Sequence, residues 1–218
     1  MDTKVKGIIL STNDYLEADK IASIFSYEQG VISAKFVGVK KEKAKLKALA
    51  QPFTLAEFEL LNKKDFNTVK QGVVIDNFPK IVSDYNKTIC AFILVDILKS
   101  ILPRQKAEPN IFLLSINALK KIEEEDAEQS LIEFVVELID ELGEGLNLFD
   151  TEGRVYLDKM VADFTPKPTM NSVEIDKKVY KALTVPSGNS AVKKACLKLL
   201  NTILLLKYDV ELKSFSFL

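Results

Sequence analysis

The stretch FVGVKKEKAKLKALAQPFTLAEFELL, residues 36–61, joins two apolar segments through a run of positive charge. Five of its lysines fall within the eight positions 40–47, and only one acidic residue, Glu42, lies among them. After this run, residues 53–61 alternate phenylalanine and leucine with threonine and glutamate, a period near two that is typical of a strand. The stretch therefore predicts a strand, a basic loop and a second strand.

The first eighty residues contain further short apolar segments with strand character on both sides of this stretch. We expect the five strands around residues 5–10, 21–25, 31–37, 53–61 and 68–75. Residues 11–14 are predicted to form a polar loop and residues 28–30 a hairpin-like turn. Five short strands joined by turns favour a small, partly open β-barrel, with the lysine run between its third and fourth strands.

The second part of the sequence has helical patterns. Residues 76–79 offer a helix cap followed by a proline, and Pro103 and Gly143 end two of the apolar patterns. We predict helices over residues 88–102, 111–122, 130–142 and 191–208, and expect residues 144–175 to be the least regular part. The fold class is thus predicted to be α+β, a barrel followed by a helical domain.

Composition limits the classes of protein that fit. The chain has 218 residues, of which 47% are apolar, so one large or two small domains with a core are expected. The net charge of −1 hides a difference, because residues 1–80 carry +3 and residues 81–218 carry −4. No apolar run approaches the ~20 residues that span a bilayer, and no secretory signal begins the sequence. A cytoplasmic protein that does not enter membranes is expected.

The sequence contains few of the residues and motifs that common catalytic sites use. Histidine is absent, which excludes Ser-His-Asp and Cys-His chemistry, and the glycine-rich phosphate-binding motifs are missing. Cys90 and Cys196 each lie in an apolar helical pattern, so we predict two buried thiols and no zinc site. The acidic run at residues 123–126 is interpreted as a loop or a helix N-terminus and not as a metal cluster, because consecutive acids on a helix point in different directions. We therefore expect no enzyme, no cofactor and no metal.

The lysine run has two interpretations that the residues alone leave open. It is either a solvated loop, or a basic groove edge that neutralises phosphates without recognising bases. Aromatic residues that could stack on bases are available, although each could equally be part of the core: Tyr15, Tyr27, Phe36 and Phe66. A protein adaptor, whose barrel and lysines bind an acidic partner protein, is the alternative function. A carboxylate-based enzyme has no positive signal.

Several of these residues are shared with one known family. The chain resembles the RecO family of bacterial recombination-mediator proteins. The most specific match is Gln51-Pro52-Phe53 after the basic loop. The other matching positions are Gly7 to Leu10, Tyr15 to Asp19, Phe25, Gly30, Lys35, Gly38, Leu46 to Ala50 and, near the end, Leu212 to Ser214.

The resemblance implies an OB-fold that binds DNA over residues 1–78 and a helical domain over residues 79–218. It also implies binding of single- and double-stranded DNA, annealing of complementary strands and a nucleoid-associated location. The implied partners are RecR and single-stranded-DNA-binding protein, with which the family helps to load recombinase. On this basis the expected DNA-binding residues are Lys35, Lys40, Lys41, Lys43, Lys45 and Lys47.

The chain departs from the family pattern in its helical domain. Many members carry a four-cysteine zinc knuckle in the region that corresponds to residues 144–175, which has no cysteine here. Relatives often place arginines where this chain has Ile132 and Glu133, before Phe134. We therefore expect the acidic tail of single-stranded-DNA-binding protein to bind weakly or at a relocated site. The remaining basic candidates for that contact are Lys99, Arg104, Lys106, Lys193, Lys194 and Lys198.

Overall fold

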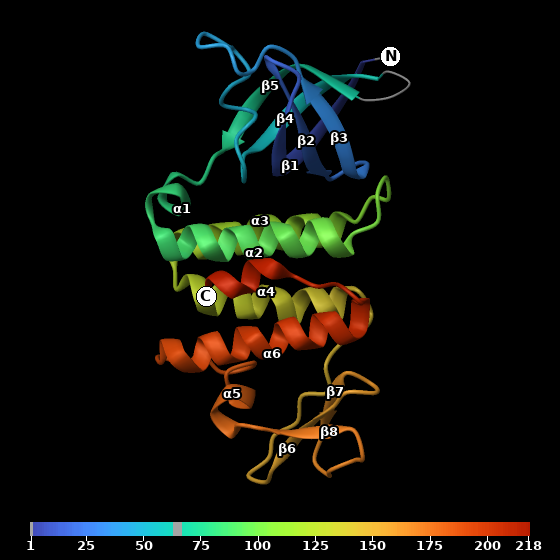
Figure 1. Ribbon diagram of the computed structural model, residues 1–218, viewed down its shortest axis with the longest axis vertical. Coiled ribbons are helices and arrows are strands. Elements are labelled where there is room, and N and C mark those ends of the chain that lie inside the picture. Colours follow the sequence, from blue (N-terminus) through green and yellow to red (C-terminus); the bar gives the residue numbers. More distant parts are fainter. Residues whose placement is uncertain (1, 63–66) are drawn as a thin grey trace. The chain divides into compact units, whose positions relative to one another are not determined.

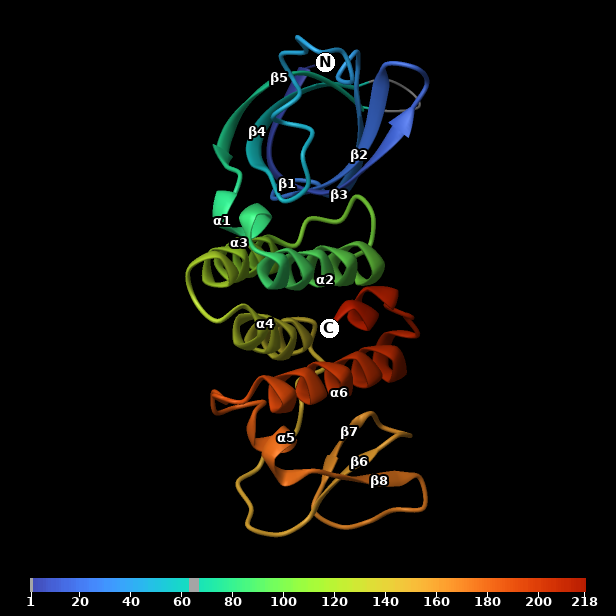
Figure 2. The ribbon, with the colours of Figure 1, turned by 60° about the vertical axis from the view of Figure 1, so that its left-hand side comes forward.

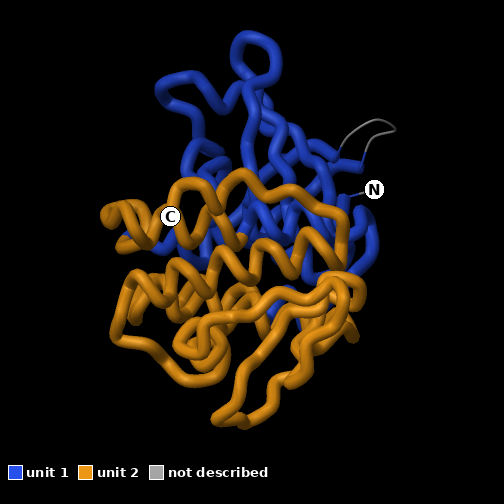
Figure 3. Tube along the Cα trace, turned by 60° about the horizontal axis from the view of Figure 1, so that its bottom comes forward, with its two compact units in different colours: residues 1–79, 95–113 blue, residues 80–94, 114–218 orange. Residues whose placement is uncertain are grey.

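The computed structural model describes residues 2–62 and 67–218 and contains both strands and helices (Figure 1). Phe66, one of the aromatic candidates, lies outside the described residues. The chain divides into two compact units, one of residues 1–79 with 95–113 and the other of residues 80–94 with 114–218 (Figure 3). Each unit has its own buried core and is described by itself below.

The first unit is built on a closed five-stranded barrel (Figure 2). Its strands follow one another around the barrel in the order β1-β2-β3-β5-β4, and β1 also pairs with β4. Closure between β3 and β5 depends on a short parallel ladder, in which Ala34 pairs with Asn67 and Lys35 with Thr68. The strands are β1 (Asp2–Tyr15), β2 (Asp19–Ser26), β3 (Gly30–Phe36), β4 (Leu55–Leu61) and β5 (Asn67–Asp76). The predicted five-stranded OB-type barrel is thereby confirmed, although it is closed rather than partly open.

Alternating apolar side chains fill this barrel, as the period of two predicts. Each strand contributes inward residues that are almost fully buried, among them Val5, Ile9, Ile24, Ile32, Phe36, Phe58, Leu60 and Val69. Phe36 and Phe58 meet edge-to-face in the interior, with ring centroids 6.3 Å apart. The lysine run therefore leaves the barrel directly from a strand whose last residue is fixed in the core.

The predicted polar loop at residues 11–14 is wrong, because β1 continues to Tyr15. Its pairing with β2 shifts register between Ile9 and Ser11 and then runs on until Tyr15 lies opposite Asp19. Such a shift bends a strand, and the bend lets β1 pair with β4 through its first half and with β2 through its second half. The polar side chains of this half are partly or fully exposed, so the hydrophobic pattern gave no sign of the strand.

Residues 104–106 run along the start of β3 within the same unit. The backbone N–H of Gln105 donates to the carbonyl of Val31 at 3.1 Å. Gly30 has φ of 69°, and a Cβ there would lie 1.9 Å from the carbonyl oxygen of Lys106. Only glycine allows both this backbone conformation and this close approach.

The predicted helices are present, with ends that differ by a few residues. They are α2 (Tyr85–Ile101), α3 (Pro109–Glu124), α4 (Ala127–Glu141) and α6 (Ser190–Tyr208), with the short α1 (Pro79–Ser83) before them and the 3-10 helix η1 (Lys213–Phe217) after them. The largest shifts are at the starts of α2 and α4, each three residues earlier than predicted. The side-chain cap of α4 is Asp126, whose carboxylate accepts from the backbone N–H of Gln129. The acidic run thus begins in the last turn of α3 with Glu123 and Glu124, and its last residue, Asp126, lies at the N-terminus of α4. Gly143, with φ of 81°, follows the last turn of α4.

Residues 144–175, expected to be irregular, contain a small antiparallel sheet in the order β7-β6-β8. Its strands are β6 (Val155–Asp158), β7 (Asp163–Thr165) and β8 (Ser172–Ile175). Tyr180 of α5 (Lys177–Lys181) packs edge-on against Phe164, and its hydroxyl donates to the carbonyl of Phe149 at 2.9 Å. The strands are too short for their period to stand out in the sequence.

Candidate nucleic-acid interface

The lysine loop, defined here as residues 37–54, is anchored to the barrel by its own apolar side chains. Val39, Leu49 and Ala50 are buried and belong to the barrel core. The loop ends on two backbone hydrogen bonds to β1: Phe53 N–H donates to Ile9 C=O at 2.9 Å, and Ile9 N–H donates to Thr54 C=O at 3.0 Å. A loop held at both ends and in the middle presents its charged residues in a fixed arrangement.

The charged side chains of this loop face outward. All five of its lysines are classed as exposed, as is Glu42: Lys40, Lys41, Lys43, Lys45 and Lys47. The alternation of lysines with Val39, Leu46 and Leu49 therefore separates the loop into a buried and a charged side. Lys35, the sixth predicted DNA contact, lies on β3 and is only partly exposed.

Asp19, the first residue of β2, holds the start of the lysine loop. Its carboxylate forms an ion pair of 2.7 Å with Lys35 and accepts a hydrogen bond of 2.7 Å from the Gly38 N–H. The hydrogen bond from Lys35 and, after it, the one from Gly38 lower the pKa of Asp19 below its ordinary 3.8. Asp19 is therefore charged at neutral pH and ties β3 to the loop.

A second acidic residue contacts the loop from the end of β1. The Asp14 carboxylate forms an ion pair of 2.8 Å with Lys40, and this hydrogen bond lowers the Asp14 pKa. The backbone N–H of Lys40 also donates to the carbonyl of Ala18 at 3.0 Å. The turn between β1 and β2 and the start of the lysine loop thus form one continuous surface.

These contacts divide the six predicted lysines into two groups. Lys35 and Lys40 are engaged with Asp19 and Asp14, so they position the loop. The other four lysines are Lys41, Lys43, Lys45 and Lys47. Within the described residues 2–62 and 67–218, none of these four forms an ion pair within 4.0 Å, so their charge is directed to solvent. Sequence reasoning missed the two aspartates, because their partners are distant in sequence.

The aromatic candidates differ in position. Phe36 is fully buried and Tyr27 packs edge-on against Phe112, with ring centroids 5.7 Å apart. Tyr15 is 37% exposed at the end of β1, and the Lys35 ammonium lies 5.0 Å from its ring centroid. Among the described aromatic candidates, Tyr15 is therefore the one that is both exposed and beside the lysine loop.

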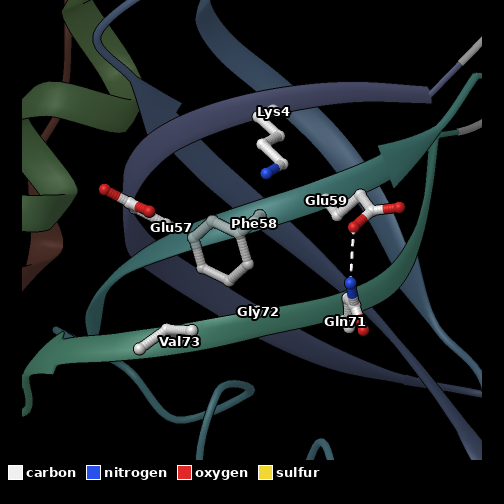
Figure 4. Close-up of a pocket in the computed structure, with 7 residues that line it drawn as sticks. All are labelled: Lys4, Glu57, Phe58, Glu59, Gln71, Gly72 and Val73. Atoms are coloured by element: carbon white, nitrogen blue, oxygen red, sulfur yellow. Dashed lines mark hydrogen bonds between the residues drawn. The ribbon is translucent and has the colours of Figure 1, made fainter.

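A shallow pocket of about 230 Å³ lies elsewhere on the barrel, between β1, β4 and β5 (Figure 4). Lys4, Glu57, Glu59 and Gln71 line it, and Glu59 accepts a hydrogen bond of 2.6 Å from Gln71. With two carboxylates against one ammonium, its lining does not favour an anion such as phosphate. None of the predicted DNA-binding lysines lines it.

The basic partner-binding candidates fall into both units. In the first unit, Lys99 and Arg104 are exposed, and Lys106 forms an ion pair of 2.6 Å with Glu108. In the second, Lys198 is exposed and Lys194 is half-buried.

Lys193 is buried and differs from the other candidates. Its ammonium lies 2.5 Å from Asp126 and 3.4 Å from Glu128. Burial is the largest single influence and opposes its charge, but the hydrogen bonds and charges of Asp126 and Glu128 together outweigh burial and raise the Lys193 pKa. This side chain therefore connects the starts of α4 and α6 and does not offer its charge to the surface.

Residues 144–175 contain no cysteine and no other set of metal ligands. In the described ranges, no three histidine, cysteine, aspartate or glutamate side chains are grouped as metal ligands would be. Glu133 forms an ion pair of 2.9 Å with Lys121, and its neighbour Ile132 is fully buried. Cys90 and Cys196 are buried and free, as predicted.

Comparison with known protein families gives two adjoining matches. The sequence model for "Recombination protein O N terminal" matches residues 1–78, and the one for "Recombination protein O C terminal" matches residues 82–153. No helix in the part of the chain that the structure describes is long and apolar enough to cross a membrane.

Similar curated proteins carry the name DNA repair protein RecO. The protein of Oceanobacillus iheyensis is 28% identical over 94% of this chain and 87% of its own length. That of Bacillus subtilis is 30% identical over 63% of this chain and 54% of its own length. That of Listeria monocytogenes is 31% identical over 56% of this chain. The matches thus cover most of the first relative and about half of the other two.

Proposed function

The chain belongs to the RecO family, and we propose on this premise that it is a non-catalytic DNA-binding protein of recombinational repair. The name of its relatives supports the repair role. The observation that carries DNA binding is the group of four outward lysines on an anchored loop beside a small barrel: Lys41, Lys43, Lys45 and Lys47.

The chemistry of these lysines favours phosphate as their ligand. An ammonium is a compact point charge on a flexible stem, which binds phosphate oxygens without discriminating between bases. Because the lysine run contains only one acidic residue, Glu42, its local charge is positive although the chain as a whole is slightly acidic. Binding is therefore proposed to be independent of sequence and sensitive to salt.

Annealing of complementary strands follows from the same charges. Two DNA strands repel each other through their phosphates, and a surface that neutralises part of this charge lets them approach. The proposed interface supplies four ammonium groups from the lysine loop, with Lys35 and Lys40 as a supporting pair. No bond is made or broken in this process, which fits the absence of histidine from the sequence.

We further propose the division of labour that the family resemblance implies. Residues 1–78 form the DNA-binding domain, and residues 79–218 contribute contacts to RecR and to single-stranded-DNA-binding protein during recombinase loading on the nucleoid. Exposed cations that could meet an acidic tail include Lys99, Arg104 and Lys198. Lys193 is assigned an internal role, because its charge is paired with Asp126 and Glu128.

The experiment compares two variants with the same change in net charge. One carries alanine at Lys41, Lys43, Lys45 and Lys47. The other, a control, carries alanine at four cations outside the loop: Lys120, Lys167, Lys178 and Lys198. Binding of a labelled oligonucleotide and the rate of annealing are measured for each.

The loop variant is expected to lose binding and annealing, while the control retains both. Equal behaviour of the two variants would place the DNA surface elsewhere. If the wild-type protein binds no DNA but retains an acidic protein partner, the adaptor function replaces this proposal.

A further inference from the structure

Three exposed apolar side chains lie beside the lysine loop and are defined here as the apolar tip: Tyr15, Leu16 and Val37. Their exposed fractions are 37%, 69% and 56%. Tyr15 is the last residue of β1, Leu16 begins the turn to β2, and Val37 is the first residue after β3. Isolated exposed apolar residues are common on proteins, but a group of them bordered by lysines indicates a ligand that is both apolar and anionic.

Leu16 has an unfavourable backbone conformation as well as an exposed side chain. Its φ is 53°, in the left-handed region, which asparagine and glycine adopt more readily than leucine. Folding gains little from this side chain, because most of it remains in water. A strained residue that is not explained by packing is a candidate for a functional contact.

Tyr15 is held in place by its surroundings. Lys35 lies over its ring at 5.0 Å and is itself fixed by the ion pair with Asp19. A ring that is positioned before a ligand arrives loses little conformational freedom on binding. The exposed part of the ring can therefore serve as a stacking surface at low entropic cost.

Hydrogen bonds join the apolar tip to the lysine loop. Gly38, the neighbour of Val37, donates to Asp19, and Lys40 donates to the carbonyl of Ala18. Lys41 follows directly and has no ion pair within 4.0 Å among the residues that the structure describes. Apolar groups and outward ammonium groups thus lie within a few residues of each other on one connected surface.

We propose that the apolar tip contacts the bases of an unpaired DNA strand, and so makes the interface selective for single strands over duplex. This inference rests on the proposed function, which supplies the phosphate contacts. In a single strand the faces of the bases are open to side chains, whereas in a duplex they stack on each other. Tyr15 stacks on a base, and Leu16 and Val37 cover the base beside it.

The test separates base contacts from phosphate contacts. Binding is measured to a single strand, to a duplex, and to a single strand of the same length whose bases have been removed. The wild-type protein is expected to bind the intact single strand about ten-fold more tightly than the base-free strand. Because the chain has no tryptophan and six tyrosines, the part of the tyrosine quenching that is lost in Tyr15→Ala reports stacking on Tyr15.

Two variants locate the contact. Tyr15→Ala is expected to abolish the preference for bases and leave duplex affinity unchanged. Leu16→Asn relieves the backbone conformation, so it is expected to keep or raise the melting temperature while it weakens single-strand binding. Tyr85→Ala removes a tyrosine that is 79% exposed on α2 and serves as the control, with no effect on binding.

The outcomes distinguish this inference from the function on which it rests. If the wild-type protein binds all three nucleic acids equally, the base contact is excluded and phosphate binding stands. If Tyr15→Ala weakens single strand and duplex by the same factor, the tip acts without bases and the inference fails. If the wild-type protein binds none of them, the proposed function fails, and the base contact with it.

Discussion

The carboxylate of Asp19 lies 2.7 Å from the Lys35 ammonium and accepts a hydrogen bond of equal length from the Gly38 N–H. One side chain thus connects the start of β2, the end of β3 and the beginning of the lysine loop. The candidate interface therefore depends on an acidic residue for its geometry, although its proposed ligand is an anion.

Asp19→Asn tests this connection through pH. The pKa of Asp19 is lowered in the folded state, so its charged form stabilises the protein above the ordinary pKa of 3.8. That contribution is lost as pH falls through the lowered value. We expect the variant to melt at a lower temperature than the wild type at pH 7, with the difference vanishing at a pH below the lowered pKa of Asp19. Melting curves at both pH values measure it.

Asp14→Asn is the matched control for that change. Asp14 pairs with Lys40 but is far more exposed than Asp19 and has no backbone partner among the hydrogen bonds of the described residues. Its substitution is expected to have a smaller effect on melting. Equal effects of both substitutions at pH 7 would contradict the anchoring role of Asp19.

Lys193→Met tests the buried ion pair between α4 and α6. The change leaves Glu128, which is nearly fully buried, without its cation. Removal of one partner from such a network is expected to lower the free energy of unfolding by about 2 kcal/mol. Denaturant titration measures this value. Lys198→Met, on the exposed side of the same helix, is expected to cost less than ~0.5 kcal/mol.

The two thiols provide a test of burial in the second unit. Burial raises the pKa of both Cys90 and Cys196 to about 12, so neither is a thiolate at neutral pH. A thiol reagent at pH 8 is expected to label neither cysteine in the native protein and both after denaturation. Rapid labelling of either one in the native state would show that the helices around it open.

The small sheet β6–β8 is expected to hold without metal. Tyr180 contacts the rings of Phe149 and Phe164 and bonds through its hydroxyl to the backbone of Phe149. A chelator should therefore leave the melting temperature unchanged. Tyr180→Phe should lower the melting temperature, because the lost hydrogen bond reduces the free energy of unfolding by about 1 kcal/mol. Elemental analysis that finds one zinc per chain would contradict this expectation.

Much of the fold was predictable because its signals are local. The alternation at residues 53–61 and the apolar stripe of α6 follow from backbone periods alone. The polar second half of β1 was not predictable, since its residues are held by pairing with β2 and not by burial. The short strands around Tyr156 and Phe164 lacked the length to show a period.

For the candidate interface, the sequence indicated the positive charges but not which lysines are paired with aspartates and which face solvent. The lysines are visible as a run, yet the pairing of Lys35 with Asp19 and of Lys40 with Asp14 joins residues separated by 16 and 26 positions. Such contacts arise from strand order, which a single sequence does not reveal. The strained, exposed Leu16 was likewise invisible, because leucine carries no signal for a left-handed turn.

The salt dependence of single-strand binding tests the central claim most directly. Four phosphate contacts from Lys41, Lys43, Lys45 and Lys47 predict a slope of about −3 for log affinity against log salt, from roughly −0.7 per contact. Replacing Lys41, Lys43 and Lys45 by alanine should flatten this slope by about 2 and weaken binding to every sequence alike. An unchanged slope and affinity in that variant would contradict the assignment of the lysine loop as the DNA-binding surface.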